Sequence, residues 1–220
     1  MQRVPEPELM DQPEQAHAYA TADFETAHQG FIDHFKQAFP EAYISGEVLD
    51  LGCGPCDISR RFALAFPDTI LHAVDGAPAM LAEASRLNSK HGLAERIVLI
   101  ESLLSDLQLP QAHYHTLISN SLLHHLHKPH QLWQNLRQHA QPEAKVFIVD
   151  LMRPADTNQA HALVEQYAVN EPEVLREDFY HSLCAAFTPD EVQQQLDEQG
   201  LSKLHVQVIS DRHMIIFGSL

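Results

Sequence analysis

Five short apolar runs alternate along the chain with stretches of helical spacing, and this alternation restricts the fold more than any other feature. The runs are EVLDLG, TILHAVD, RIVLIE, YHTLISN and AKVFIVDLM, at residues 47–52, 69–75, 96–101, 114–120 and 144–152. Helical stretches follow at 57–66, 77–92 and 129–140. Short apolar runs of this kind are typical of buried parallel strands. We therefore expect a parallel sheet with right-handed crossovers and with ligands at the carboxyl ends of its strands.

The last third of the chain departs from this alternation. Thr188 and Glu191 match a capping box, and Gly200 ends the helix that follows. Two strands at 203–210 and 213–220 are then separated by only a tight turn, so they must pair antiparallel. The predicted fold class is α/β: a doubly wound, mostly parallel seven-stranded sheet with a C-terminal antiparallel hairpin and helices on both faces.

The pattern also predicts how the chain is divided. Residues 1–15 are rich in Pro, Glu and Gln, and we expect them to be a mobile tail. Aromatic residues at mostly helical spacing indicate an N-terminal helical cap over 16–45. The ligand-binding domain is expected over 46–220, with 155–187 as an insert that covers the site.

The composition limits the partners and the compartment. The 220 residues, 45% of them hydrophobic, suffice for one compact domain. Thirty acidic residues against 14 basic ones give a net charge of −16, which repels nucleic acid and anionic membrane surfaces, and we expect neither as a partner. No apolar run reaches the roughly 18 residues of a membrane span, and the start lacks the apolar core of a signal peptide. We therefore expect a cytoplasmic protein.

The stretch LGCGPC, residues 51–56, combines a Cys-x-x-Cys motif with two glycines. A thioredoxin-like function would require a depressed thiol pKa at Cys53. The flanking residues oppose it, because Leu51 and Gly52 stand where an aromatic residue is usual and Asp57 disfavours a thiolate. Three cysteines in the whole chain also exclude a four-cysteine zinc site.

The two glycines favour a cofactor loop. Gly52 and Gly54 lie between a predicted strand and helix, where a missing Cβ lets the backbone turn sharply and approach a ligand. Asp50 and Asp57 would repel a pyrophosphate but attract the sulfonium and ammonium groups of S-adenosylmethionine. Asp75 ends the second predicted strand, where an acid accepts hydrogen bonds from ribose hydroxyls in nucleotide-binding folds.

Three segments resemble successive motifs of the class I S-adenosylmethionine-dependent methyltransferases: VLDLGCGPCDIS, HAVDGAPAML and LISNSLLHHLHKPHQLWQNLRQHAQPEAKVFIVDLMRP. The resemblance extends from about 47 to 154. It departs from the family after the third strand, where Ser102 and Leu103 replace a common acid, and at His115, where aspartate is common. The cofactor-binding residues that the resemblance implies are Asp50, Gly52, Cys53, Gly54, Asp75, Gly76, Met80, Ser102, Leu103 and Asn120.

A tandem histidine follows the fourth predicted strand. His124 and His125 lie just beyond that strand and Asp150 ends the fifth, so both strand ends can approach one pocket. Some small-molecule O-methyltransferases with a tandem histidine resemble this arrangement, which implies His124 as general base, Asp150 as its orienter and His125 as a further catalytic candidate. The cluster with His127 and His130 has no recognised ligand spacing, and we expect no metal.

These observations predict transfer of a methyl group from S-adenosylmethionine to an oxygen, nitrogen or sulfur atom of a small-molecule acceptor, with S-adenosylhomocysteine as product. The reaction is an in-line displacement, in which alignment alone can supply most of the acceleration and a base is optional. Two alternatives stay open: a non-catalytic S-adenosylmethionine-binding regulatory module and a nicotinamide-dependent oxidoreductase. The acceptor, and the choice between monomer and dimer, also stay open.

Overall fold

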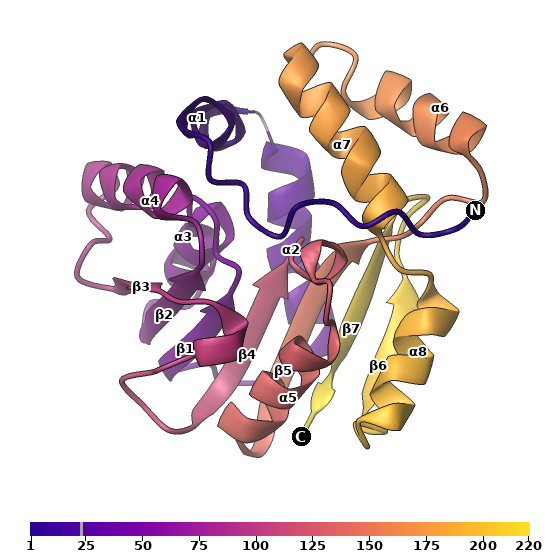
Figure 1. The fold of residues 1–220 in the computed structure, drawn as a ribbon. Helices are drawn as coiled ribbons and strands as arrows, with labels where there is room; N and C mark the ends of the chain where they lie inside the picture. Colours follow the sequence, from indigo (N-terminus) through magenta and orange to yellow (C-terminus); the bar gives the residue numbers. More distant parts are fainter. Residues whose placement is uncertain (23) are drawn as a thin grey trace.

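The computed structural model describes residues 1–22 and 24–220, which form a single seven-stranded sheet in the order β3-β2-β1-β4-β5-β7-β6 (Figure 1). β1 to β5 pair in parallel, and β7 lies antiparallel between β5 and β6. The predicted fold class is therefore confirmed. The strands are β1 Gly46–Leu51, β2 Thr69–Asp75, β3 Ile97–Glu101, β4 Tyr114–Asn120, β5 Ala140–Leu151, β6 Leu204–Val208 and β7 His213–Ser219.

Most helices lie where the sequence pattern expects them, apart from their exact ends, whereas two helices form in the covering insert over 155–187, for which no helix was predicted. The α-helices are α1 Pro13–Thr21, α2 Glu25–Ala38, α3 Asp57–Ala65, α4 Pro78–Lys90, α5 His130–His139, α6 Thr157–Tyr167, α7 Glu173–Ala185 and α8 Pro189–Glu198, and the short 3₁₀ helices are η1 Leu104–Asp106 and η2 Leu123–His125. α8 begins with the expected capping box. β5 begins at Ala140, earlier than predicted, because Ala140 pairs with Tyr114 ahead of an irregular register in β4. Residue 23 of the predicted cap lies outside the described residues.

Each face of the sheet carries its own hydrophobic core. On one face Phe31 and Phe35 of α2 pack with Phe62 of α3 against Phe147 of β5, and the rings of Phe31 and Phe147 meet edge to face at 5.0 Å. On the other face α5 and α8 pack against the sheet around the fully buried Trp133. Helices on both faces are what a parallel sheet with crossover connections requires.

The side chains of a strand alternate between these two cores, and this alternation aims the polar residues at the strand ends. In β1, Val48 belongs to the core of α2 and α3, so Asp50 points to the same face, toward α3. In β5, Val146 and Ile148 belong to the opposite core, so Asp150 points to that face, where η2 lies. The period of two therefore places the two carboxylates on opposite faces of the sheet.

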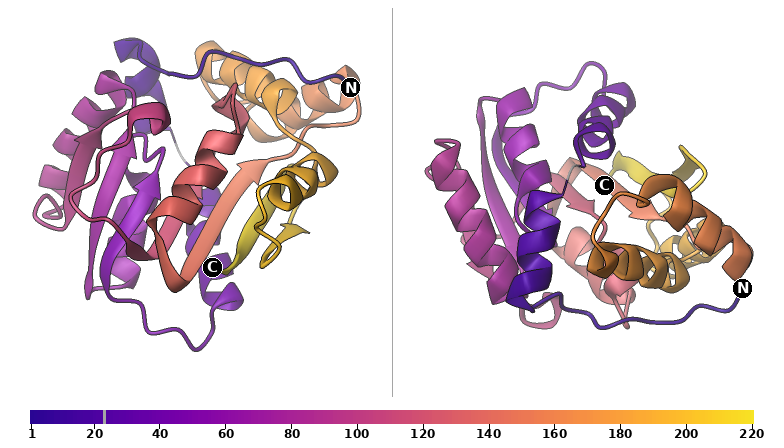
Figure 2. Two further views of the ribbon diagram at one scale, coloured as in Figure 1. Left: turned by 60° about the horizontal axis from the view of Figure 1, so that its bottom comes forward. Right: turned by 90° about the horizontal axis from the view of Figure 1, so that it is seen from above.

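α1, α6 and α7 cover the carboxyl ends of the parallel strands (Figures 1 and 2). α6 and α7 pack on each other through Leu163, Val164 and Leu183, and α1 packs on α4 through Ala16 and Met80. Among the described residues, no helix is both long and apolar enough to cross a membrane.

Residues 1–12, which we call the N-terminal strap, run in extended form from α6 and α7 to α1 (Figure 1). The Arg3 guanidinium donates hydrogen bonds to the carbonyls of Ala185, His124 and Leu126, at 2.5, 2.8 and 3.1 Å. The polar side chains of the strap thus have partners on distant elements, which its composition does not reveal.

Candidate active site

A cavity of about 890 Å³ opens at the carboxyl ends of the parallel strands, beneath the N-terminal strap and the covering helices. It includes the point between β1 and β4 where the strand order reverses, which is where doubly wound sheets bind ligands. All ten predicted cofactor residues line it, and so do His124 and His125, whereas Asp150 lies behind His124. The fold therefore brings the predicted site residues together.

The glycine loop between β1 and α3 has the backbone shape that a close ligand needs. Gly52 and Gly54 have positive φ angles of 74° and 50°. A Cβ on Gly52 would lie 2.8 Å from Cβ of Leu122, whereas the space at Gly54 is open. Gly54 can therefore let a ligand approach the backbone closely, which suits the loop that S-adenosylmethionine needs.

The cysteines of the loop are unsuited to redox chemistry. Cys53 and Cys56 are both buried. Burial raises the pKa of the Cys53 thiol well above its usual range, and its hydrogen bond and charge interaction with Cys56 raise it further. Because the thiolate is the reactive form, this environment opposes disulfide exchange.

Asp50 lies under the loop and is only 1% exposed. Its carboxylate accepts a short hydrogen bond from the Ser59 hydroxyl of α3. Burial raises the pKa of Asp50 to about 7, the Ser59 hydrogen bond opposes the rise, and the nearby charge of Asp75 adds to it. A cation bound at the loop would favour the ionised form of Asp50.

Asp57, the other acid expected to attract a cationic cofactor, is already engaged. It accepts hydrogen bonds from His28 Nδ1 at 2.7 Å and from Arg61 Nε at 2.8 Å. Burial alone would raise the pKa of Asp57, but the hydrogen bonds and charges of these two partners hold it well below the usual range. Asp57 lines the cavity as a charge that the protein itself has balanced.

Asp75 ends β2 opposite the loop. Its Oδ2 accepts a hydrogen bond from the Gly54 amide and its Oδ1 one from the Ala77 amide, each at 2.8 Å. Burial raises the pKa of Asp75, although the backbone hydrogen bonds oppose the rise. The Gly76 amide also interacts with this carboxylate, which with about four acceptor sites can still accept a hydrogen bond from the ribose.

The predicted adenine side of the cavity contains a residue that the sequence analysis missed. A Cβ on Gly76 would lie 2.7 Å from Leu103 and 2.9 Å from Leu9 of the strap. Ser102 and Met80 also line this side, and the Asn120 amide at the end of β4 donates a hydrogen bond to Ser121 at 3.2 Å. No sequence signal indicates Leu9, because its segment has no apolar period.

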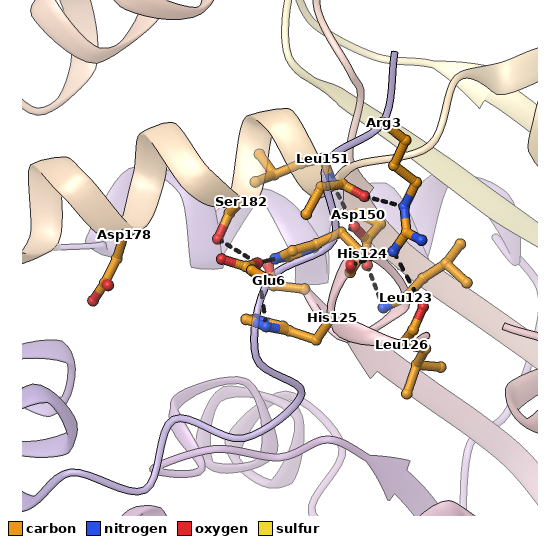
Figure 3. Close-up of polar contacts among 12 residues, drawn as sticks. Arg3, Glu6, Leu123, His124, His125, Leu126, Asp150, Leu151, Asp178 and Ser182 are labelled. Atoms are coloured by element: carbon orange, nitrogen blue, oxygen red, sulfur yellow. Dashed lines mark hydrogen bonds and ion pairs between the residues drawn. The ribbon is translucent and has the colours of Figure 1, made fainter. Parts of the chain in front are cut away.

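His124 and Asp150 form a buried dyad, with Nδ1 of His124 2.6 Å from Oδ1 of Asp150 (Figure 3). The side chains of His124 and Asp150 are 2% and 1% exposed. Asp150 also accepts hydrogen bonds from the backbone amides of Leu123 and Leu151, each at 2.8 Å. Because a carboxylate only accepts hydrogen bonds, Nδ1 must be the donor, which leaves Nε2 to act as an acceptor when the ring is neutral.

The charges around the dyad act on His124 in opposite directions. Burial lowers the pKa of His124, but the charge and hydrogen bond of Asp150 and the charge of Glu6 outweigh it, so the pKa is raised. His125 lies beside His124 with ring centres 4.3 Å apart and the ring planes tilted by 35°. Burial, followed by the charge of His124, holds the pKa of His125 well below its usual range.

Glu6 reaches both histidines from the strap (Figure 3). Its Oε1 lies 3.7 Å from Nε2 of His124 and 3.3 Å from Nδ1 of His125, and it accepts a hydrogen bond from the Ser182 hydroxyl at 3.0 Å. Burial raises the pKa of Glu6 overall, although the charge of His124 opposes the rise. His127 does not join this group, because its half-exposed ring donates to the backbone carbonyl of Glu6 instead.

Known methyltransferases are similar to this chain in domain and fold. Residues 48–144 match the family model of a methyltransferase domain. No curated protein matches the chain in sequence. The structure is similar to that of the plantazolicin methyltransferase BpumL in complex with a pentazolic desmethylPZN analog and SAH, with a TM-score of 0.70 and 13% identity over 95% of this chain and 92% of that one. It is also similar to a SAM-dependent methyltransferase from Aquifex aeolicus, with a TM-score of 0.66 and 16% identity over 94% and 98%.

The matched domain, the doubly wound sheet with its terminal hairpin and the glycine loop facing Asp75 agree on the class of protein: residues 48–144 are similar to a methyltransferase domain, and the chain has the fold of S-adenosylmethionine-dependent methyltransferases. It is therefore an enzyme that takes its methyl group from S-adenosylmethionine. The predicted activity and cofactor are confirmed at this level, and the non-catalytic and nicotinamide alternatives are not supported.

Proposed function

We propose that the enzyme methylates a small-molecule acceptor in the cytoplasm, with His124 as the general base and Asp150 as its orienter. The single observation that carries this proposal is the buried dyad, in which Asp150 engages Nδ1 of His124 and leaves Nε2 as the acceptor of a residue that lines the same cavity as the cofactor residues. The net charge of −16 supports an acceptor other than nucleic acid or a membrane lipid.

The lining residues support one orientation of S-adenosylmethionine. The glycine loop and Asp50 would hold its methionine end, Asp75 the ribose, and Gly76, Met80 and Leu103 would surround the adenine. When bound, this cofactor supplies a methyl carbon already activated by a positively charged sulfur. The volume of about 890 Å³ is at the upper end of the usual range of small-molecule sites, which suits a cavity shared by cofactor and acceptor.

The dyad accepts the proton that the acceptor loses during methyl transfer. As the acceptor's lone pair forms a bond to the methyl carbon, the carbon–sulfur bond breaks and its electron pair stays on sulfur. Nε2 of His124 takes the proton that the acceptor loses, and Asp150 stabilises the resulting imidazolium and keeps the ring in place. In this proposal the transfer step needs no metal, because the methyl group is already activated.

Transfer of radiolabelled methyl from S-adenosylmethionine to a panel of small alcohols, phenols, amines and thiols tests the proposal. Once an acceptor is found, His124→Ala should lower turnover about 10²- to 10⁴-fold, the usual contribution of general-base catalysis, while cofactor affinity stays nearly constant. The exposed His130 of the same segment provides the matched control, and His130→Ala should keep wild-type turnover. Turnover of His124→Ala within a few-fold of wild type would contradict the base assignment.

A further inference from the structure

Glu6, His124 and His125 bring three metal-binding atoms together at the edge of the cavity. All three atoms lie within 4.8 Å of one another. The Glu6 oxygen is 3.7 Å from Nε2 of His124 and 3.3 Å from Nδ1 of His125. Ligands of a tetrahedral zinc ion with bonds of about 2.0 to 2.1 Å are about 3.3 to 3.4 Å apart, so the two separations from Glu6 are close to this spacing, and the two ring nitrogens would approach each other from within 4.8 Å.

The second ring nitrogen of His124 is held as metal-binding histidines usually are. Its Nδ1 donates to Asp150, which itself accepts two backbone amides. A carboxylate behind a histidine fixes the ring tautomer, directs Nε2 at the metal and strengthens it as a ligand. The hydrogen bond to Asp150 that would support His124 as a general base therefore also prepares His124 to bind a metal ion.

The other two members are only partly engaged, since Glu6 accepts one hydrogen bond, from Ser182. Nδ1 of His125 is buried and makes no hydrogen bond to any described residue. Glu6 is 11% exposed, and its 3.7 Å separation from Nε2 of His124 is too long for a hydrogen bond. A buried carboxylate needs compensation, and a cation between the three atoms supplies it at all three positions.

We propose that Glu6, His124 and His125 form a zinc site, with the Ser182 hydroxyl orienting Glu6 and the fourth position facing the cavity. Two histidines and one glutamate form a known set of three protein ligands for zinc in sites that keep one open position. The site uses the strap, because Glu6 is its only ligand from outside the η2 segment. The zinc site therefore requires the strap in the position that it has in the structure.

This inference does not rest on the proposed function. It does restrict the proposed function to the zinc-free form of the enzyme. A zinc ion on Nε2 of His124 occupies the lone pair that would accept the acceptor's proton. The zinc-bound form should therefore be inactive if His124 is the base. If methyl transfer continued with zinc bound at this site, His124 would not be the general base. The measured zinc affinity would still support the zinc site.

Zinc affinity can be measured on the full chain, free of any histidine tag, by competition with a chromophoric chelator, with Co²⁺ as a spectroscopic probe of coordination. Wild type should bind one ion, and the Co²⁺ form should show the intense visible absorption of four-coordinate cobalt. Glu6→Gln keeps the shape of the side chain and should weaken zinc binding by at least 10-fold. Asp150→Asn removes the support behind His124 and should weaken it about 10- to 100-fold.

Glu8→Gln is the matched control, because Glu8 lies in the same strap and loses the same charge without touching either ligand histidine. It should keep wild-type zinc affinity. With 16 histidines in the chain, weak surface binding is the competing explanation. Equal affinities in wild type and Glu6→Gln, with circular dichroism showing both folded, would overturn the proposal.

Discussion

Asp50→Asn should stabilise the cofactor-free protein, and the gain should grow with pH. The wild-type carboxylate is buried beneath the glycine loop and must ionise there at neutral pH. An asparagine of nearly the same shape can still accept the Ser59 hydrogen bond through its amide oxygen, but it never carries the buried charge. The substitution therefore isolates the cost of that charge.

The size of the effect follows from the pKa of Asp50, which burial above all raises from 3.8 to about 7, with Ser59 opposing and Asp75 adding to the rise. Because the folded-state pKa is the higher one, the contribution of Asp50 to stability is fully present below about pH 4 and is lost as the pH rises through about 7. About three pKa units at 1.36 kcal/mol each give about 4 kcal/mol.

Urea unfolding of wild type and Asp50→Asn between pH 4 and 8, without cofactor, measures this difference. His213, whose pKa burial lowers to about 4, gives stability an opposite slope over part of this range. It is common to both proteins, so the difference between them isolates Asp50. The variant should gain about 4 kcal/mol relative to wild type from pH 4 to 8. A difference that stays constant across this range would refute the reasoning.

Three further predictions concern the loop and the strap. Asp75→Ala should weaken S-adenosylmethionine binding about 10- to 150-fold in a calorimetric titration, because hydrogen bonds to a charged group contribute roughly 1.5 to 3 kcal/mol; unchanged affinity would remove Asp75 from the site. The double variant Cys53→Ser and Cys56→Ser should still bind the cofactor, and the wild-type protein should not reduce insulin disulfides. If wild type reduced insulin strongly and the double variant did not, the cysteines would have a redox role. Arg3→Met removes the hydrogen bonds that fasten residues 1–12, so limited proteolysis should cleave the strap faster than in wild type, and equal rates would count against this anchoring.

Most of the fold could be predicted from the sequence, because each strand carries its own local signal. The apolar run of β1 shows both its burial and the position of its end at Gly52, and the end of the apolar run of β5 places Asp150 at the carboxyl edge. The dyad of His124 and Asp150 could be expected for the same reason, since parallel strands end at one edge of the sheet.

The contribution of the strap could not be predicted, because it depends on contacts between distant parts of the chain. Glu6 meets His124 across more than 100 residues, and Leu9 lies against Gly76 without any periodic neighbour in its own segment. A stretch rich in Pro and Glu has the composition of a mobile tail, and only the positions of α7 and η2 give its polar side chains buried partners. The balanced charge of Asp57 was missed for a similar reason, because His28 comes from the cap.

A crystal structure with bound S-adenosylhomocysteine tests the central claim most directly. The account predicts that the ligand lies in the cavity with its ribose hydroxyls within hydrogen-bond distance of Asp75 and its amino acid end on the glycine loop. Its sulfur should face the part of the cavity that Nε2 of His124 lines. A ligand bound elsewhere, or bound with its sulfur directed away from His124, would contradict the account.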